Sequence, residues 1–139
     1  MAATRSAVSE WHGSLTDGSG RVALESSGLG TFDVTWASRT EQPDGLTSPE
    51  ELIAAAHAAC YSMAFSNVLA QAGHPPATLN TRAEVDFQPG EGVTGIRLEV
   101  SGDVPGLDAD GFREAAETAK DACPVSQALA AVPIALTVD

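Results

Sequence analysis

The chain of 139 residues is long enough for one domain with a buried core, and 43% of its residues are hydrophobic. Seven basic residues against nineteen acidic ones give a net charge of −12, which argues against binding to nucleic acid or anionic lipid because like charges repel. The N-terminus lacks the apolar core of a signal peptide, and no uninterrupted apolar stretch reaches membrane length, so we expect a cytoplasmic protein. In that reducing compartment the two cysteines are expected to be free, metal-bound or redox-active.

Three segments before residue 40 alternate with the two-residue period of a β-strand, over roughly residues 7–15, 21–25 and 31–37. The third is the clearest, because it puts Phe32, Val34 and Trp36 on one face. Glycines mark the turns between these segments, so a meander of strands is expected.

A long helix is predicted to start after these strands. Ser48 is suited to the N-cap and Pro49 to the first helical position, while Glu50 and Glu51 complement the helix dipole. From Leu52 to about Ala72 there is no charged residue. A helix that is apolar on nearly every side is expected to be buried. In a chain this short, burial on all sides suggests a homodimer.

The remaining pattern gives strands near residues 81–88 and 94–104, a helix capped by Asp108, a short helix at 124–130 and a closing strand at 132–138. Grouped strands separated by a long helix favour an α+β fold with antiparallel sheets. No repeat or low-complexity segment divides the chain, which predicts a single domain over residues 1–139.

The two cysteines occupy different settings. If Pro124 opens a helix, Cys123 is its N-cap, where free N–H groups favour a thiolate; a structural cysteine at a helix junction is the alternative. Cys60 lies well inside the long helix, where a packed small residue is the simpler explanation. A reactive thiol at Cys60 would need a cation from outside that helix, and Arg39, just beyond the aromatic strand, is the best candidate.

His57 stands three residues before Cys60 and shares roughly its face of the helix. This H-x-x-C spacing could support a zinc site together with Cys123 and one further ligand, although a hydrogen-bonded core histidine is the more common arrangement. Phosphate-binding glycine loops and the G-x-S-x-G motif are absent, so the sequence gives no support to nucleotide or serine-hydrolase chemistry.

Two long motifs identify a family resemblance. TSPEELIAAAHAACYSMAFS at 47–66, together with ACPVSQALAAVPI at 122–134, resembles the OsmC/Ohr family of thiol-dependent hydroperoxide reductases. The PEEL and AHAAC segments are closer to the OsmC branch than to the Ohr branch. The W-x-G at 11–13, the arginine after the third strand and VPGLDADGF before the second helix extend the similarity over nearly the whole chain.

The resemblance implies roles for four residues. It makes Cys60 the cysteine that attacks the peroxide and Cys123 the cysteine that resolves the product. Arg39 and Glu50 match the arginine–glutamate pair that organises the peroxide site in the family. It also implies an intertwined homodimer with active sites at the interface, a dithiol reductant of the lipoyl type, and no metal, flavin or haem.

The spacing of Glu50 and Cys60 favours a shared site. Ten residues on one straight helix separate these two positions by about 15 Å along the axis and turn them about 80° apart. A Glu50 from a partner chain can therefore serve Cys60 more easily than the Glu50 of the same chain.

The expected activity is reduction of organic hydroperoxides, with hydrogen peroxide a poorer substrate, because the surroundings of Cys60 are apolar. The cycle runs through a Cys60 sulfenic acid and a Cys60–Cys123 disulfide. The alternative from another class is a dimeric small-molecule-binding module with structural cysteines.

Overall fold

The computed structural model describes all 139 residues, and they form two compact units, Met1–Pro49 and Glu50–Asp139. Each unit contains one three-stranded sheet. The predicted α+β class is confirmed, and the predicted restriction to antiparallel pairing is wrong for one strand of the second sheet.

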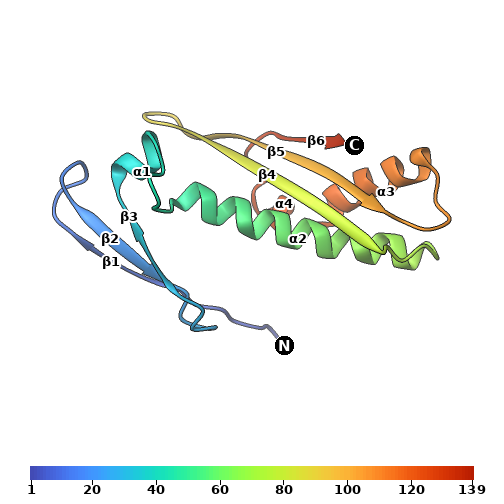
Figure 1. Cartoon of the computed structure of the whole chain (residues 1–139), viewed down its shortest axis with the longest axis horizontal. Coiled ribbons are helices and arrows are strands. Elements are labelled where there is room, and N and C mark those ends of the chain that lie inside the picture. Colours follow the sequence, from blue (N-terminus) through green and yellow to red (C-terminus); the bar gives the residue numbers. More distant parts are fainter. The chain divides into compact units, whose positions relative to one another are not determined.

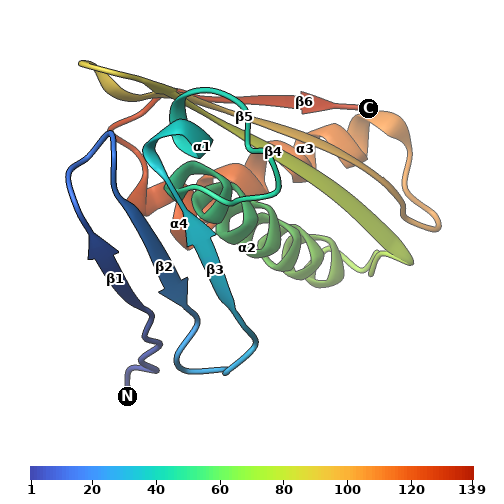
Figure 2. The same cartoon turned by 60° about the vertical axis from the view of Figure 1, so that its left-hand side comes forward.

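The first unit is a meander of three antiparallel strands, as the turn pattern predicted. Its strands are β1 (Val8–His12), β2 (Ser19–Ala23) and β3 (Thr31–Val34), paired in that order, and they lie side by side in Figure 2. The first and third are shorter than the alternating segments in the sequence, because the alternation continues into residues that make no ladder hydrogen bonds, and the second starts two residues earlier than predicted at the same length.

A tryptophan and a glycine fix the contact between the first two strands. Trp11 lies opposite Gly20 in the register, and a Cβ placed on Gly20 would come within 2.5 Å of the indole ring. The indole Nε1 donates a hydrogen bond to the Gly13 carbonyl oxygen at 3.0 Å. The W-x-G segment is therefore a local structural unit in which the indole covers Gly20, a strand position without a side chain.

The third strand ends earlier than expected, in a short helix. Thr35 caps α1 (Trp36–Thr40): its side chain accepts from the Ser38 N–H at 3.0 Å, while the Ser38 hydroxyl accepts from the Thr35 N–H at 3.0 Å. This reciprocal capping turns the chain into a helix, so Trp36 is helical, and its assignment to the strand at 31–37 is wrong.

The second unit is built around α2 (Pro49–Gln71), which begins at the proline as predicted. Its sheet contains β4 (Thr78–Gln88), β5 (Gly92–Asp103) and β6 (Ile134–Val138), in that order. Between β5 and β6 the chain forms α3 (Ala109–Ala122) and α4 (Pro124–Ala128), visible in Figure 1. Strands β4 and β5 pair antiparallel, whereas β6 pairs parallel with β5 because two helices carry the chain back to the start of the sheet.

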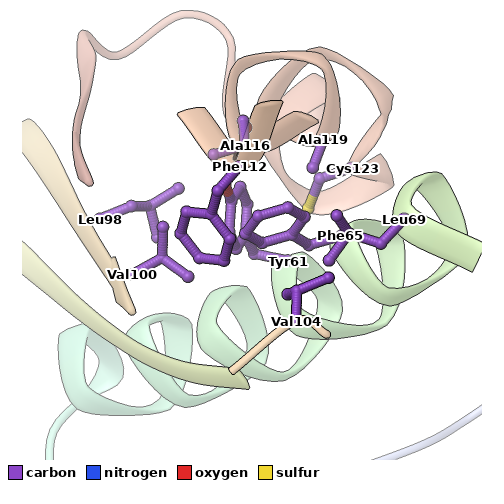
Figure 3. Close-up of a cluster of buried hydrophobic side chains, with 10 residues drawn as sticks. All are labelled: Tyr61, Phe65, Leu69, Leu98, Val100, Val104, Phe112, Ala116, Ala119 and Cys123. Atoms are coloured by element: carbon purple, nitrogen blue, oxygen red, sulfur yellow. Dashed lines mark hydrogen bonds between the residues drawn. The ribbon is translucent and has the colours of Figure 1, made fainter. Parts of the chain in front are cut away.

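The core of this unit lies between one stripe of α2, the inner face of α3 and the β5 strand. Tyr61, Phe65 and Leu69 recur every four residues on α2 and are fully buried. Figure 3 shows them packed with Phe112, Ala116 and Ala119 of α3, with Leu98, Val100 and Val104, and with Cys123. The Phe65 and Phe112 ring centroids are 5.1 Å apart.

The rest of α2 is not covered within its own unit. Its buried residues are confined to one stripe and the first turn, and Met63 is 72% exposed. By length and composition α2 could also cross a membrane, with only 22% of its apolar window buried. Polar residues such as His57, Ser62 and Asn67 interrupt its apolar stretch, as the sequence indicated, but they are too few to bring its mean hydropathy below that of a membrane span, a test that the core helix of a soluble protein also passes.

Candidate active site

The two cysteines meet inside the second unit. Cys60 lies in the middle of α2 and Cys123 between α3 and α4, 63 residues further along the chain. Their sulfur atoms are 3.4 Å apart, and both thiols are free. Cys60 is partly exposed, whereas Cys123 is fully buried. Two thiols at this distance need only a small movement of the side chains to form a disulfide.

Cys123 occupies the junction of two helices for a clear local reason. Its N–H donates the last hydrogen bond of α3, to the Ala119 carbonyl oxygen at 2.9 Å. Pro124 disfavours helical geometry in the residue before it, so α3 ends there. Cys123 is consequently the N-cap of α4, as predicted, although its side chain makes no regular capping hydrogen bond.

The surroundings of Cys123 favour its thiolate. Burial by itself raises the pKa of the thiol, but the Ser126 N–H and hydroxyl, the Cys60 thiol and the Val125 N–H outweigh it. The pKa of Cys123 therefore lies below that of an ordinary cysteine. Whichever of the two thiols keeps its proton can donate it to the other sulfur.

Cys60 has the opposite tendency within its own unit. Burial raises the pKa of its thiol, and contact with Cys123 adds to this, although the Val125 N–H acts against it. The protonated form of Cys60 is thus favoured by its immediate neighbours. A reactive Cys60 requires an additional positive charge, which agrees with the sequence argument for an arginine.

His57 is fully buried one turn before Cys60, and its Nε2 lies 2.7 Å from the Ser126 hydroxyl oxygen. Its Nδ1 has no hydrogen-bond partner, and burial lowers the pKa of the imidazole, so it stays neutral. His57 is thus a hydrogen-bonded core histidine, the alternative to a zinc ligand. No group of three or more histidine, cysteine or carboxylate side chains is arranged to hold a metal ion.

Arg39 follows the end of β3 in the first unit, as expected, but it lies on the short helix α1. Its guanidinium carbon is 5.9 Å from the centre of the Trp36 ring, within reach of a cation–π interaction. A cavity of about 380 Å³ in this unit is lined by Arg39, both tryptophans, Leu15 and Val34, among others. The arginine therefore borders a mainly apolar cavity.

Glu50 is buried in the first turn of α2. Because α2 runs unbroken from Pro49 to Gln71, the separation of about 15 Å between Glu50 and Cys60 applies to the folded chain. The structure brings the two cysteines together, and it does not bring Glu50 to the Cys60 of its own chain.

Ser126 is the site residue that the sequence reasoning missed. It is buried, its hydroxyl oxygen lies 2.7 Å from His57 Nε2, and it lowers the pKa of Cys123. The available signal was its spacing: Ser126 stands three residues after the N-cap Cys123, which is the capping-box spacing.

Residues 42–138 match the family model described as OsmC-like protein. The chain is 43% identical to Peroxiredoxin OsmC of Escherichia coli strain K12 over 124 residues, covering 87% of this chain and 86% of the relative. An organic hydroperoxide resistance protein OsmC from Legionella pneumophila has a solved structure with TM-score 0.76 and 25% identity, covering 99% of each chain. An organic hydroperoxide resistance protein from Elizabethkingia anophelis shares the fold, with TM-score 0.78 at 24% identity, covering 100% of this chain and 97% of the other.

The fold, the paired thiols and these relatives define a cysteine-based peroxidase. The chain belongs to the OsmC-like family.

Proposed function

We propose that this protein reduces organic hydroperoxides to alcohols, and hydrogen peroxide less well, with Cys60 as the attacking thiol and Cys123 as the resolving thiol. The observation that carries the proposal is the 3.4 Å contact between the two sulfur atoms. Cys60 is the more accessible of the two, which suits it to meet the substrate, and Cys123 is held behind it in the core.

The chemistry proceeds in three steps. The Cys60 thiolate attacks the distal peroxide oxygen, the O–O bond breaks, and the alkoxide takes up a proton and leaves as an alcohol. Cys123 attacks the resulting sulfenic acid; an S–S bond forms, the S–O bond breaks, and the hydroxide leaves as water with the proton that Cys123 lost. A dithiol then reduces the disulfide by thiol–disulfide exchange and becomes a disulfide itself.

Arg39 and Glu50 supply the charge that Cys60 lacks. A guanidinium near Cys60 would favour its thiolate and hold the peroxide, and Glu50 would orient that guanidinium through a bidentate pair. Because Glu50 is too far along α2 to serve its own Cys60, we infer that the pair acts on the Cys60 of a partner chain. The apolar cavity beside Arg39 fits the hydrocarbon part of an organic peroxide.

The same proposal includes the assembly of the enzyme, its reductant and its location. We infer an intertwined homodimer with sites at the interface, each chain contributing one OsmC-like domain over residues 1–139. The uncovered apolar face of α2 supports this assembly. The reductant is an external dithiol, and a lipoyl dithiol is the first to test. The reaction needs no metal or organic cofactor, and the low number of cysteines suits a cytoplasmic enzyme.

The first experiment counts thiols. One equivalent of an organic hydroperoxide should convert both thiols of the reduced protein into an intramolecular Cys60–Cys123 disulfide, detected by mass spectrometry of a non-reducing digest. Cys123→Ser should instead accumulate a sulfenic acid at Cys60 that a dimedone probe captures. Cys60→Ser should form neither the disulfide nor the sulfenic acid. If both thiols of the wild type stay free, the mechanism is wrong. A disulfide inert to peroxide and to lipoyl dithiols would favour a binding module.

The second experiment concerns the charged pair. Arg39→Ala should raise the pKa of Cys60 and slow peroxide attack at least about tenfold, since one pKa unit corresponds to about 1.4 kcal/mol. Glu50→Ala should have a milder effect, because the guanidinium keeps its charge. Arg113→Ala on the exposed face of α3 is the matched control and should change neither quantity.

Mixed dimers test which chain supplies the arginine. A dimer of one Arg39→Ala chain and one Cys60→Ser chain should recover one working site, although neither homodimer is fully active. Homodimers of Arg39→Ala with wild-type rates would exclude the arginine from the mechanism. Mixed dimers without recovered activity would place it in the same chain as its cysteine.

A further inference from the structure

The buried pair His57 and Ser126 has no part in the mechanism described so far. His57 is fully buried, Ser126 nearly so, and their side chains are 2.7 Å apart although 69 residues separate them in the chain. Burying two polar side chains is costly unless each finds partners, so their place beside the thiols calls for a chemical explanation.

The direction of this hydrogen bond follows from the other ring nitrogen. Nδ1 has no partner. If Nδ1 carried the proton, a buried N–H would have no acceptor, which folded proteins rarely tolerate. The tautomer with the proton on Nε2 avoids this, and Nε2–H then donates to the Ser126 oxygen. The hydroxyl hydrogen of Ser126 is consequently free to donate elsewhere.

The position of Ser126 on α4 determines what that hydrogen can reach. Cys123 is the N-cap of α4, and Ser126 stands at the third helical position, where a side chain lies next to the N-cap residue. The first turn is closed by the Gln127 N–H, which donates to the Cys123 carbonyl oxygen at 3.0 Å. The Ser126 hydroxyl also favours the thiolate form of Cys123.

We propose that His57 and Ser126 are positioning residues: the imidazole turns the Ser126 hydroxyl hydrogen toward the Cys123 sulfur, and Cys123 is thereby made the leaving thiolate when the disulfide is reduced. The assignment rests on the proposed Cys60–Cys123 disulfide. The chain of donors runs from Nε2–H of His57 to the Ser126 oxygen, and from the Ser126 O–H to the sulfur.

Two other titratable groups act on Cys123, and neither supplies the same stabilisation. Cys60 becomes part of the disulfide. Tyr61 donates its hydroxyl proton to the Ala116 carbonyl oxygen at 2.8 Å, and burial raises the pKa of that hydroxyl, so it stays protonated and directed elsewhere.

This arrangement gives the reductive step a direction. A thiolate of the dithiol attacks the Cys60 sulfur, the S–S bond to Cys123 breaks, and the electron pair stays on Cys123 as a thiolate. The second thiol of the reductant then loses its proton and displaces Cys60, completing the reductant's own disulfide. Two properties favour attack at Cys60. Cys60 is the more exposed sulfur, and attack there makes Cys123 the leaving group, which departs faster because it is the more acidic thiol.

The first test measures the Cys123 thiol without any peroxide. In a Cys60→Ser background, the pH dependence of thiolate absorbance gives the pKa of Cys123. Ser126→Ala and His57→Leu should each raise that pKa by about one unit, a tenfold loss of thiolate at neutral pH. His57→Gln, which keeps an N–H donor, should restore most of it. An unchanged pKa in Ser126→Ala or His57→Leu, or no restoration by glutamine, would overturn the proposed chain.

The second test follows the direction of exchange. A small monothiol added to the oxidised protein, followed by rapid alkylation, should give a mixed disulfide on Cys60 and an alkylated Cys123. Ser126→Ala should slow its formation several-fold. A monothiol found on Cys123 would overturn the assignment. The absorbance test needs no disulfide, so it separates failure of this proposal from failure of the peroxidase mechanism.

Discussion

The sheet β4-β5-β6 buries a hydrophobic core against α2 and α3, whereas every hydrophobic side chain of the sheet β1-β2-β3 stays at least partly exposed. Several large apolar side chains of the first unit are exposed, among them Val8, Trp11, Leu15, Leu29 and Phe32. A small sheet needs a covered apolar face to be stable. The difference indicates that the second unit carries the stability of the single chain, and that the first unit requires a cover, which the proposed dimer would supply.

The largest expected effect lies in the core of the second unit. Phe65→Ala should lower the free energy of unfolding by about 3 to 5 kcal/mol, because a fully buried ring is replaced by a cavity. Urea unfolding followed by circular dichroism measures this. Phe32→Ala in β3 is the matched control and should cost far less in a monomeric chain. Equal losses at the two positions would remove the contrast between the sheets.

The next effect concerns the uncovered face of α2. Met63→Glu should weaken the homodimer by about 100-fold, or about 2.7 kcal/mol, because a charge would be buried at the interface. Light scattering across a dilution series gives the dissociation constant. Glu114→Lys on the exposed face of α3 should leave it unchanged. A wild-type protein that is monomeric at micromolar concentration would contradict the dimer and the shared site together.

Two glycines test the sheets at the level of one methyl group. Gly20→Ala should cost about 1 to 3 kcal/mol, because the added Cβ would lie 2.5 Å from the Trp11 ring. Gly95→Ala in β5 should be neutral or slightly stabilising, since its nearest neighbour is the Asp86 side chain at 3.7 Å. Thermal unfolding compares the two variants. A harmless Gly20→Ala would mean that the indole is not fixed on this strand.

The smallest effect depends on pH and on the buried histidine of the second unit. Burial lowers the pKa of His57 in the folded state, so the unfolded chain binds a proton more readily. Stability from this group is present above pH 6.5 and is lost as the pH falls below it, by at most about 1.4 kcal/mol per pH unit. Urea unfolding of wild type and His57→Gln between neutral and mildly acidic pH should show this loss only in the wild type. If the free energy of unfolding changed with pH equally in the two proteins, the role of His57 would be contradicted.

The helices were the most predictable part of the fold, because their ends carry local chemical signals. Pro49 marks the start of α2, and Asp108 caps α3 by accepting from the Gly111 N–H at 2.7 Å. The parallel pairing of β6 was missed, although a strand–helix–strand connection favours it. The helix α1 was missed because strand-like alternation continued through Trp36, and only the capping by Thr35 interrupts it.

The site could be predicted only in part from the residues. Local chemistry identified Cys123 as an N-cap, but for Cys60 it favoured a packing role, and only the family resemblance paired the two thiols. Ser126 stayed unnoticed because its importance comes from a contact with His57 across 69 residues, which no local pattern encodes. The roles of Arg39 and Glu50 remain predictions.

The junction that holds Cys123 also bears on how long the protein survives in the cell. A Cys60–Cys123 disulfide would close a loop of 63 residues, which in the chain-entropy account stabilises the folded state by about 4 kcal/mol. Proteases that cleave the unfolded chain would then find the oxidised protein a poorer substrate than the reduced one. Peroxide stress would lengthen the life of each molecule, so the amount of enzyme could rise without new synthesis.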